Sequence, residues 1–217
     1  MANEKRPGKG PAKPRPAPTP VAMGTRAVAA ALRIAQEEGW NAAALDRIAA
    51  EAEITLEELQ DMFPSRAALL DSFIADIDHD MLGRVADADG ADGARDRLFS
   101  VIMARYDALR PYRDAFIAIA RGALRDPATA WTLTWTTRRS AEWMLASAGI
   151  VHTGIEGALK MHAVAAVLAA TLRTFARDDS DDLSPTMAAV DRALVRCERV
   201  MGWVQRVPRP PGQRRAR

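Results

Sequence analysis

Residues 54–66, ITLEELQDMFPSR, are the stretch that decides how this chain is interpreted. Leu59 and Phe63 are four residues apart, which places both on one face of a short helix, and Pro64 ends that helix. A short helix between a turn and a further helix has the outline of a DNA-recognition helix. The stretch nevertheless carries three carboxylates and only one base, Arg66, at its far end. Such a charge is unusual for a helix that approaches phosphates.

The rest of the chain also predicts helices. Apolar residues recur at helical spacing, and no alternating strand pattern with hairpin turns is present. The sequence therefore predicts an all-α fold of about nine helices. We expect helices over 24–38, around 45–52, over 56–63 and from Ser65 onward. After the Gly/Asp-rich loop or hinge ADADGADGA, further helices are expected near 95–109, 111–126, 127–148, 155–176 and 185–204.

Charge and composition divide the chain further. Residues 1–22 carry a net charge of +4 and residues 205–217 a net charge of +5, so an acidic body of −7 lies between two basic, Pro-rich ends. These ends hold too few large apolar residues to fold, and they suit either nucleic-acid or anionic-membrane binding or a merely solubilising role. We expect a basic arm over 1–22, a helix-turn-helix domain over 23–70, a helical regulatory and dimerisation domain over 71–204, and a basic tail over 205–217.

The first 70 residues resemble the N-terminal helix-turn-helix of the TetR family. The resemblance rests on the segment GWNAAALDRIAAEAEITLEELQDMFPSRAALLDSF, which matches without a gap. It implies a homodimer that inserts one helix per subunit into successive major grooves of double-stranded DNA, on a palindromic operator. It also implies a second domain that binds a small hydrophobic ligand, and thus a ligand-responsive transcriptional regulator. The residues expected nearest DNA are Arg47, Thr55, Glu57, Glu58, Gln60 and Arg66.

Three positions depart from the family's usual pattern. Glu53 stands where the family usually has a turn glycine, Ala44 where a hydroxyl residue opens helix two, and Gln60 where a tyrosine follows the recognition-helix leucine. Over residues 25–66, four bases face eight acids. Either the basic arm, Lys5 to Arg15, and Arg66 supply the phosphate contacts, or the fold no longer reads DNA. The alternative is a TetR-fold protein that binds lipid or a partner, similar to a ubiquinone-biosynthesis accessory protein.

Aromatic and methionine side chains suggest where a ligand would bind. Trp131 and Trp135 are one helical turn apart, and such side chains favour either an apolar ligand pocket or ordinary core and interface packing. The predicted pocket residues are Met103, Tyr106, Phe116, Trp131, Trp135 and Met144.

The last predicted helix carries apolar residues at alternating spacings of three and four, a seam that a partner helix packs against. The preceding helix is apolar almost all round. We expect this pair to be completed by the same pair of a second subunit, with intramolecular packing as the alternative. The predicted dimer residues are His162, Leu168, Met187, Val190, Leu194 and Met201.

Other chemistry finds little support. Cys197 is the single cysteine, so no intrachain disulfide forms and a reducing cytoplasm is expected. The longest apolar run, MHAVAAVLAATL, is too short to span a bilayer, and no signal peptide is evident. DIDHD at 76–80 and DDSDDLS at 178–184 lack the pattern of a metal site, and the latter predicts a solvated loop before the last helix. No enzyme motif is present, and we expect no metal, no cofactor and no catalysis.

Overall fold

The computed structural model describes residues 19–86, 93–150 and 153–206, with side chains described up to residue 200. Over these ranges the chain is all-α, as predicted, with nine α-helices and two short 3₁₀ turns. The elements are α1 (Pro20–Glu38), η1 (Trp40–Ala42), α2 (Leu45–Glu51), α3 (Leu56–Met62), α4 (Arg66–Ala86), α5 (Ala94–Leu109), η2 (Arg110–Tyr112), α6 (Arg113–Ala123), α7 (Pro127–Ser147), α8 (Gly154–Phe175) and α9 (Ser184–Arg206).

Helix α1 begins four residues earlier than expected. Thr19 accepts a hydrogen bond from the Ala22 amide, and Pro20 occupies the first turn, where its missing N–H costs nothing. The helix therefore takes up residues 20–22 of the predicted basic arm. The remainder of that arm, residues 1–18, the tail from 207 and most of the predicted hinge, 87–92, lie outside the described residues.

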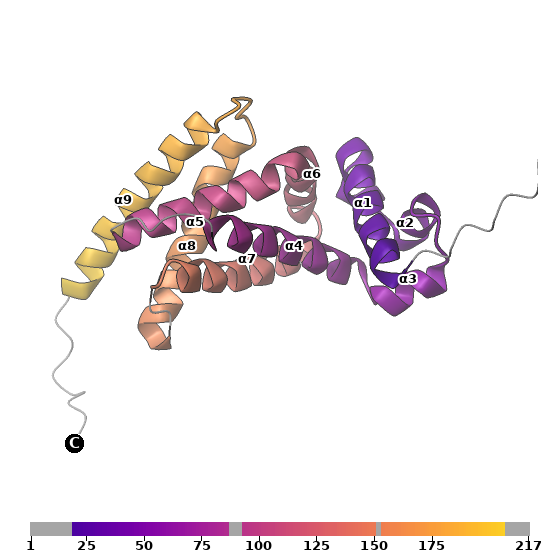
Figure 1. The fold of residues 1–217 in the computed structure, drawn as a ribbon, viewed down its shortest axis with the longest axis horizontal. Helices are drawn as coiled ribbons and strands as arrows, with labels where there is room; N and C mark the ends of the chain where they lie inside the picture. Colours follow the sequence, from indigo (N-terminus) through magenta and orange to yellow (C-terminus); the bar gives the residue numbers. More distant parts are fainter. Residues whose placement is uncertain (1–18, 87–92, 151–152, 207–217) are drawn as a thin grey trace, which may run out of the picture.

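Helices α1, α2 and α3 form a small unit at one end of the molecule, and α4 runs from it into the remaining helices (Figure 1). The α4 helix is continuous through residue 70, where the sequence suggested a domain boundary. Its inner face is buried as predicted: Leu70, Phe73, Ile74, Ile77 and Met81 are each at most 3% exposed. Ser65 accepts from the Ala68 amide at 3.1 Å, as expected for the residue before this helix.

The helices that follow α3 pack against one another. Helix α7 packs on α4, α8 lies between α7 and α9, and α5 contacts both α7 and α9. Helix α6 packs on α1, so it touches the N-terminal unit directly. Pro111 lies in η2, just before α6, whereas the sequence placed it in the first turn of that helix. Buried side chains from α1 through α9 form one connected apolar core.

Candidate nucleic-acid interface and regulatory surfaces

The turn between α2 and α3 contains an unusual backbone conformation. Glu53 has φ +52°, the left-handed region that favours glycine. This is the position where the sequence lacks the expected glycine, so the chain keeps the turn and accepts the conformational cost, about 1–2 kcal/mol for a residue with a side chain. The helix-turn-helix geometry is thus retained without its usual turn residue.

Helix α3 begins with a reciprocal cap. The Thr55 hydroxyl accepts from the Glu58 amide at 3.1 Å, and the Glu58 carboxylate accepts from the Thr55 amide at 2.8 Å. Both residues were expected near DNA, but their polar atoms serve to start the helix. A sequence signal for this was present, since Thr followed three residues later by Glu is the capping-box pattern.

The solvent-exposed face of α3 carries Leu56, Glu57, Gln60 and Asp61, and Leu59 is buried beneath it. Of the six residues expected nearest DNA, Glu57 and Gln60 are exposed and take no part in the capping and ion-pair contacts that hold the other four. Gln60 offers a donor and an acceptor to a base edge, and Glu57 offers an acceptor that suits a cytosine amino group.

The bases of the helix-turn-helix segment are engaged with acids. Over residues 25–66, all of which the structure describes, each of the four arginines forms an ion pair. The pairs are Arg26–Glu53 at 3.8 Å, Arg33–Glu51 at 2.6 Å, Arg47–Glu38 at 2.5 Å and Arg66–Asp126 at 2.9 Å. The hydrogen bond from Arg47 also lowers the pKa of Glu38. A phosphate would have to compete with these carboxylates for each guanidinium.

Arg66 lies at a junction between the two parts of the molecule and not on an open DNA-facing surface. Its guanidinium stacks over the Trp40 ring at 5.1 Å, donates to the Trp40 carbonyl at 3.3 Å and pairs with Asp126. The Trp40 indole donates to the Thr129 hydroxyl at 2.8 Å, and that hydroxyl donates to Asp126 at 2.5 Å. The pKa of Asp126 is lowered by the Thr129 hydrogen bond, by the amides of the first turn of α7, and by Arg66.

The structure does not bring the six predicted pocket residues into one cavity. Met103, Tyr106 and Met144 belong to the packed core, with the Tyr106 hydroxyl 2.6 Å from that of Thr171. Burial raises the pKa of Tyr106 to about 12. Phe116 packs against the core from its edge.

Trp131 and Trp135 instead lie on the outer surface of α7, 74% and 59% exposed. They line a groove of about 250 Å³ together with Met161 and His162 of α8. Four of the six residues thus belong to packing and two to an open surface, a division that helical spacing does not reveal.

An apolar cavity of about 210 Å³ lies elsewhere, between α5, α7, α8 and α9. Its walls are mainly aliphatic, although Arg95, Lys160 and Glu198 also line it. Cys197 belongs to the same lining, and burial raises the pKa of its thiol. The apolar lining residues include Leu98, Leu145, Ile150, Val164, Val167 and Leu194. Sequence reasoning missed this site because such residues look the same whether they fill a core or leave a space.

The predicted dimer residues divide between core and surface. Val190 and Leu194 are at most 5% exposed and pack within the chain, and Leu168 is half-buried against the core. Their apolar seam is therefore satisfied by intramolecular packing, the alternative considered above. His162 and Met187 are exposed, and the Met201 side chain lies outside the described part of the chain.

An exposed apolar surface does remain on α8 and α9. It forms a depression of about 410 Å³ that is lined mainly by apolar side chains, together with two polar ones, His162 and Arg196. The apolar lining residues include Leu159, Ala166, Ala170, Ala193 and Val200. Helix α8 is long enough to cross a membrane, and an 18-residue stretch within it has a mean hydropathy of 1.4, with 28% of that stretch buried within the chain. The 12-residue run considered in the sequence thus belongs to a longer apolar helix of 22 residues, although one such helix does not establish a membrane span.

The acidic loop before α9 is held to the start of that helix by hydrogen bonds to Asp178. Asp178 is only 2% exposed and accepts from the amides and hydroxyls of Ser180 and Thr186. Burial opposes ionisation of Asp178, but these hydrogen bonds outweigh it and lower its pKa. The prediction of a solvated loop was wrong for this residue.

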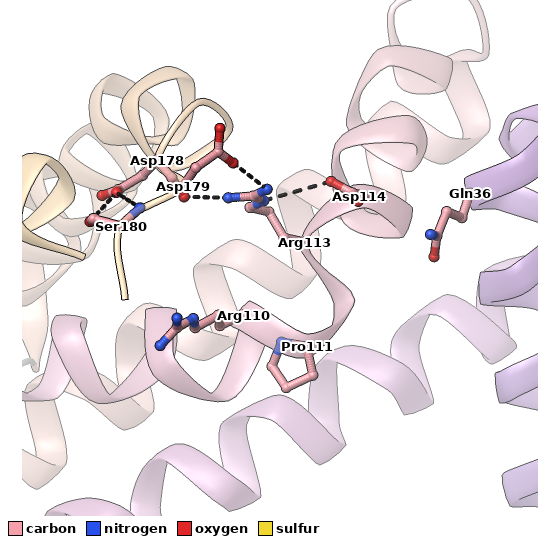
Figure 2. Close-up of a pocket in the computed structure, with 8 residues that line it drawn as sticks. All are labelled: Gln36, Arg110, Pro111, Arg113, Asp114, Asp178, Asp179 and Ser180. Carbon is pink, nitrogen blue, oxygen red and sulfur yellow. Dashed lines mark hydrogen bonds and ion pairs between the residues drawn. The ribbon is translucent and has the colours of Figure 1, made fainter. Parts of the chain in front are cut away.

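Figure 2 shows the same loop beside Arg113, which pairs with Asp179 at 2.8 Å and with Asp114 at 3.6 Å. Together these residues line a polar cleft of about 270 Å³ whose opposite wall is Gln36 of α1. The second arginine of this cleft, Arg110, pairs with Asp181 at 3.4 Å. Because both arginines are already paired with carboxylates, neither offers an unopposed charge to an anion.

A buried ion pair and a hydrogen bond link α4, α5 and α7. Asp78 of α4 accepts from Arg105 of α5 and, at 2.7 Å, from the Ser140 hydroxyl of α7. Burial raises the pKa of Asp78 and lowers that of Arg105, so each charge depends on its partner. Within the described residues, no group of three or more His, Cys, Asp or Glu side chains is placed to hold a metal ion.

No family model matches the sequence, and no curated protein does either. Solved structures do match. A TetR transcriptional regulator from Nitrosomonas europaea superposes with a TM-score of 0.64 at 22% identity, covering 81% of this chain and 98% of that one. One from Rhodococcus sp. RHA1 gives 0.54 at 19% identity over 81% and 97%, and one from Streptomyces coelicolor gives 0.53 at 14% identity over 87% and 89%.

The chain therefore has the fold of TetR-type transcriptional regulators, as the resemblance in its first 70 residues predicted. The matches cover 89% to 98% of the solved chains, so the shared fold includes the helices from α4 to α9 as well as the helix-turn-helix. At these identities the likeness concerns the fold alone.

Proposed function

We propose that this protein is a cytoplasmic, homodimeric, DNA-binding transcriptional regulator that responds to a small hydrophobic ligand. The observation that carries the proposal is the intact helix-turn-helix with an outward-facing Gln60 on α3. The turn is preserved although Glu53 must adopt an unfavourable left-handed backbone conformation, and Thr55 caps the start of α3. A helix held in this way and exposed along one face is the element that enters a major groove.

The phosphate contacts would come from outside α3. The five bases of the N-terminal arm precede α1, whose first turns lie against α3: Gly24 is close to Phe63 and Met62. These bases would supply the attraction that the acidic face of α3 lacks, and Gln60 and Glu57 would then contact base edges. The arm is thus expected to control affinity, and α3 to control sequence preference.

Selection of bound fragments from a random DNA pool tests this division of roles. The full chain is compared with a variant in which the five arm bases are replaced by Gln and with Gln60→Ala, each at two salt concentrations. We expect a palindromic motif with the full chain, the same motif at reduced affinity with the arm variant, and an altered motif with Gln60→Ala. Binding without any motif, abolished by salt, would contradict sequence-specific regulation.

We propose that two copies associate through the exposed α8 and α9 surface. Small side chains at Ala166 and Ala170 allow another helix to approach closely, and leaving this apolar depression in water is unfavourable. Ala166→Arg should yield a monomer in analytical ultracentrifugation, with Glu142→Arg, on exposed α7, as the control that stays dimeric. The ligand would occupy the aliphatic cavity between α5, α7, α8 and α9, which suits a small apolar molecule.

A second function has a specific observation in its favour. All four arginines of residues 25–66 are paired with carboxylates, and α3 itself carries no base, so the fold also suits a protein that binds lipid or a protein partner and not DNA. The exposed Trp131 and Trp135 would then contact the lipid or partner. Co-sedimentation with phosphatidylcholine vesicles and Trp fluorescence would detect lipid binding, and its absence together with a recovered DNA motif would exclude this alternative.

A further inference from the structure

The two parts of the molecule are joined by a closed ring of polar contacts. Trp40 donates through its indole nitrogen to Thr129, Thr129 donates to Asp126, Asp126 pairs with Arg66, and Arg66 returns to Trp40 through its carbonyl and its ring. We call these four residues the interdomain ring. Trp40 begins η1, one residue after α1, and Arg66 begins α4, whereas Asp126 is the N-cap of α7 and Thr129 lies in its first turn.

We propose that the interdomain ring positions the helix-turn-helix, so that a displacement of the first turn of α7 is passed directly to α1–α3. Its members act through the placement of α3 and are positioning residues. In this arrangement Arg66 is not a phosphate ligand, because Asp126 holds its guanidinium at 2.9 Å. The link to DNA affinity rests on the proposed function, but the link between α7 and the helix-turn-helix does not.

The packing around Trp40 supports this role. Trp40 is 2% exposed although it lies on a three-residue turn at the edge of the N-terminal unit. Gly122 of α6 faces it so closely that a Cβ at this position would lie 3.0 Å from the Trp40 Cβ. The tryptophan is therefore wedged between α4, α6 and α7, and its indole nitrogen finds its acceptor on α7.

Each oxygen of Thr129 and Asp126 in the interdomain ring has a defined set of hydrogen-bond partners. Thr129 is 5% exposed and its hydroxyl satisfies two partners at once, accepting from Trp40 and donating to Asp126. Asp126 divides its oxygens: Oδ1 accepts from the Ala128 amide and caps α7, while Oδ2 accepts from Thr129 and Arg66. One carboxylate thus starts α7 and fixes Arg66, so that α7 cannot shift at its beginning without breaking contacts to the N-terminal unit.

Two conservative variants break the ring while preserving α7. Thr129→Val keeps the shape and removes the hydroxyl, and Asp126→Asn keeps a side chain that caps helices well but removes the charge. The matched control is Asp71→Asn. Asp71 pairs with Arg139 at 2.6 Å, also between α4 and α7 and also partly exposed, but this pair lies away from Trp40.

Hydrogen exchange of the full chain is measured first, without DNA. In both ring variants we expect amides of residues 45–62 to exchange at least about fivefold faster. The reason is that the loss of one hydrogen bond raises the equilibrium constant for local opening by about that factor. Amides of α5, α8 and α9 should be unchanged, and Asp71→Asn should leave residues 45–62 unchanged. Unaltered exchange over 45–62, or equal acceleration in every helix, would overturn the proposal.

DNA affinity is then measured on a fragment recovered by the selection above. We expect about fivefold weaker binding for Thr129→Val, although Thr129 is buried far from the face of α3, and no change for Asp71→Asn. Equal affinities of Thr129→Val and the wild type would overturn the role of the ring in DNA binding. If the wild type recovers no fragment, the proposed function fails, and the exchange measurement still decides whether the ring couples α7 to the helix-turn-helix.

Discussion

A pair of glycine substitutions tests how rigidly Trp40 is held. Alanine in place of glycine within a helix is normally stabilising, by up to about 1 kcal/mol, because it reduces the freedom of the unfolded chain. At Gly83 of α4 nothing lies within 4 Å of the added Cβ, so Gly83→Ala should show this gain. At Gly122 the added Cβ would lie 3.0 Å from the Trp40 Cβ and 3.6 Å from its Cδ1.

The cost at Gly122 depends on whether Trp40 can move. Its indole is bonded to Thr129 at 2.8 Å and its ring lies beneath Arg66, so a shift of a few tenths of an ångström strains both contacts. Overpacking of this kind costs about 1–3 kcal/mol, which exceeds the helix gain or cancels it. We therefore expect Gly122→Ala to be less stable than Gly83→Ala by about 1–3 kcal/mol.

Urea unfolding followed by circular dichroism measures both variants against the wild type. The comparison is valid where the slopes with urea agree, since the midpoints then report stability alone. If Gly122→Ala proves as stable as Gly83→Ala, the Trp40 side chain can shift without cost, and the junction around it is not rigid.

Three further outcomes follow from the contacts described. Arg105→Leu should destabilise the fold by about 3–5 kcal/mol in chemical denaturation, because it leaves the buried carboxylate of Asp78 unpaired, and Asp78→Asn in the same chain should recover part of the loss. Glu53→Gly should stabilise the fold by up to about 1 kcal/mol and raise the urea midpoint, since glycine adopts φ +52° without strain. An unchanged or lower midpoint would count against strain in the turn. Because the pKa of Asp178 is lowered in the folded state, its contribution is present above the ordinary value near 4 and is lost as pH falls through the lowered one. The stability difference between the wild type and Asp178→Asn should therefore shrink on acidification, and a pH-independent difference would show that its ionisation does not stabilise the loop.

Sequence patterns predicted the helices well but their partners less well. The seam of α9 illustrates the difference. The spacing of Val190 and Leu194 correctly indicates an apolar stripe, yet both side chains are buried by the same chain, while the open surface is lined by other residues of α8 and α9. An amphipathic pattern shows that a face is buried without showing what buries it. For the same reason, the spacing of Trp131 and Trp135 did not show whether they are buried or exposed. Only the tertiary structure shows that both are exposed and line a groove beside α8.

Arg66 is the clearest case at the candidate interface. Its position at the start of α4 suggested a phosphate contact, and no local signal connects it with an aspartate 60 residues away. Glu58 differs, because the Thr55 to Glu58 spacing already carried the capping pattern that the structure contains. Local hydrogen bonds can be inferred from spacing, whereas contacts across the fold require the arrangement of helices.

The sequence by itself determined the all-α class, the helix-turn-helix and its acidic α3, because helical periodicity, proline, capping residues and charge act over a few neighbouring positions. The tertiary structure decided which charges remain open to solvent, where the cavities lie, and that Trp40 and Arg66 join the N-terminal unit to α7. The Trp40–Thr129 and Arg66–Asp126 contacts join residues 89 and 60 positions apart, and their energies arise only when packing removes the side chains from water and brings each donor to its acceptor.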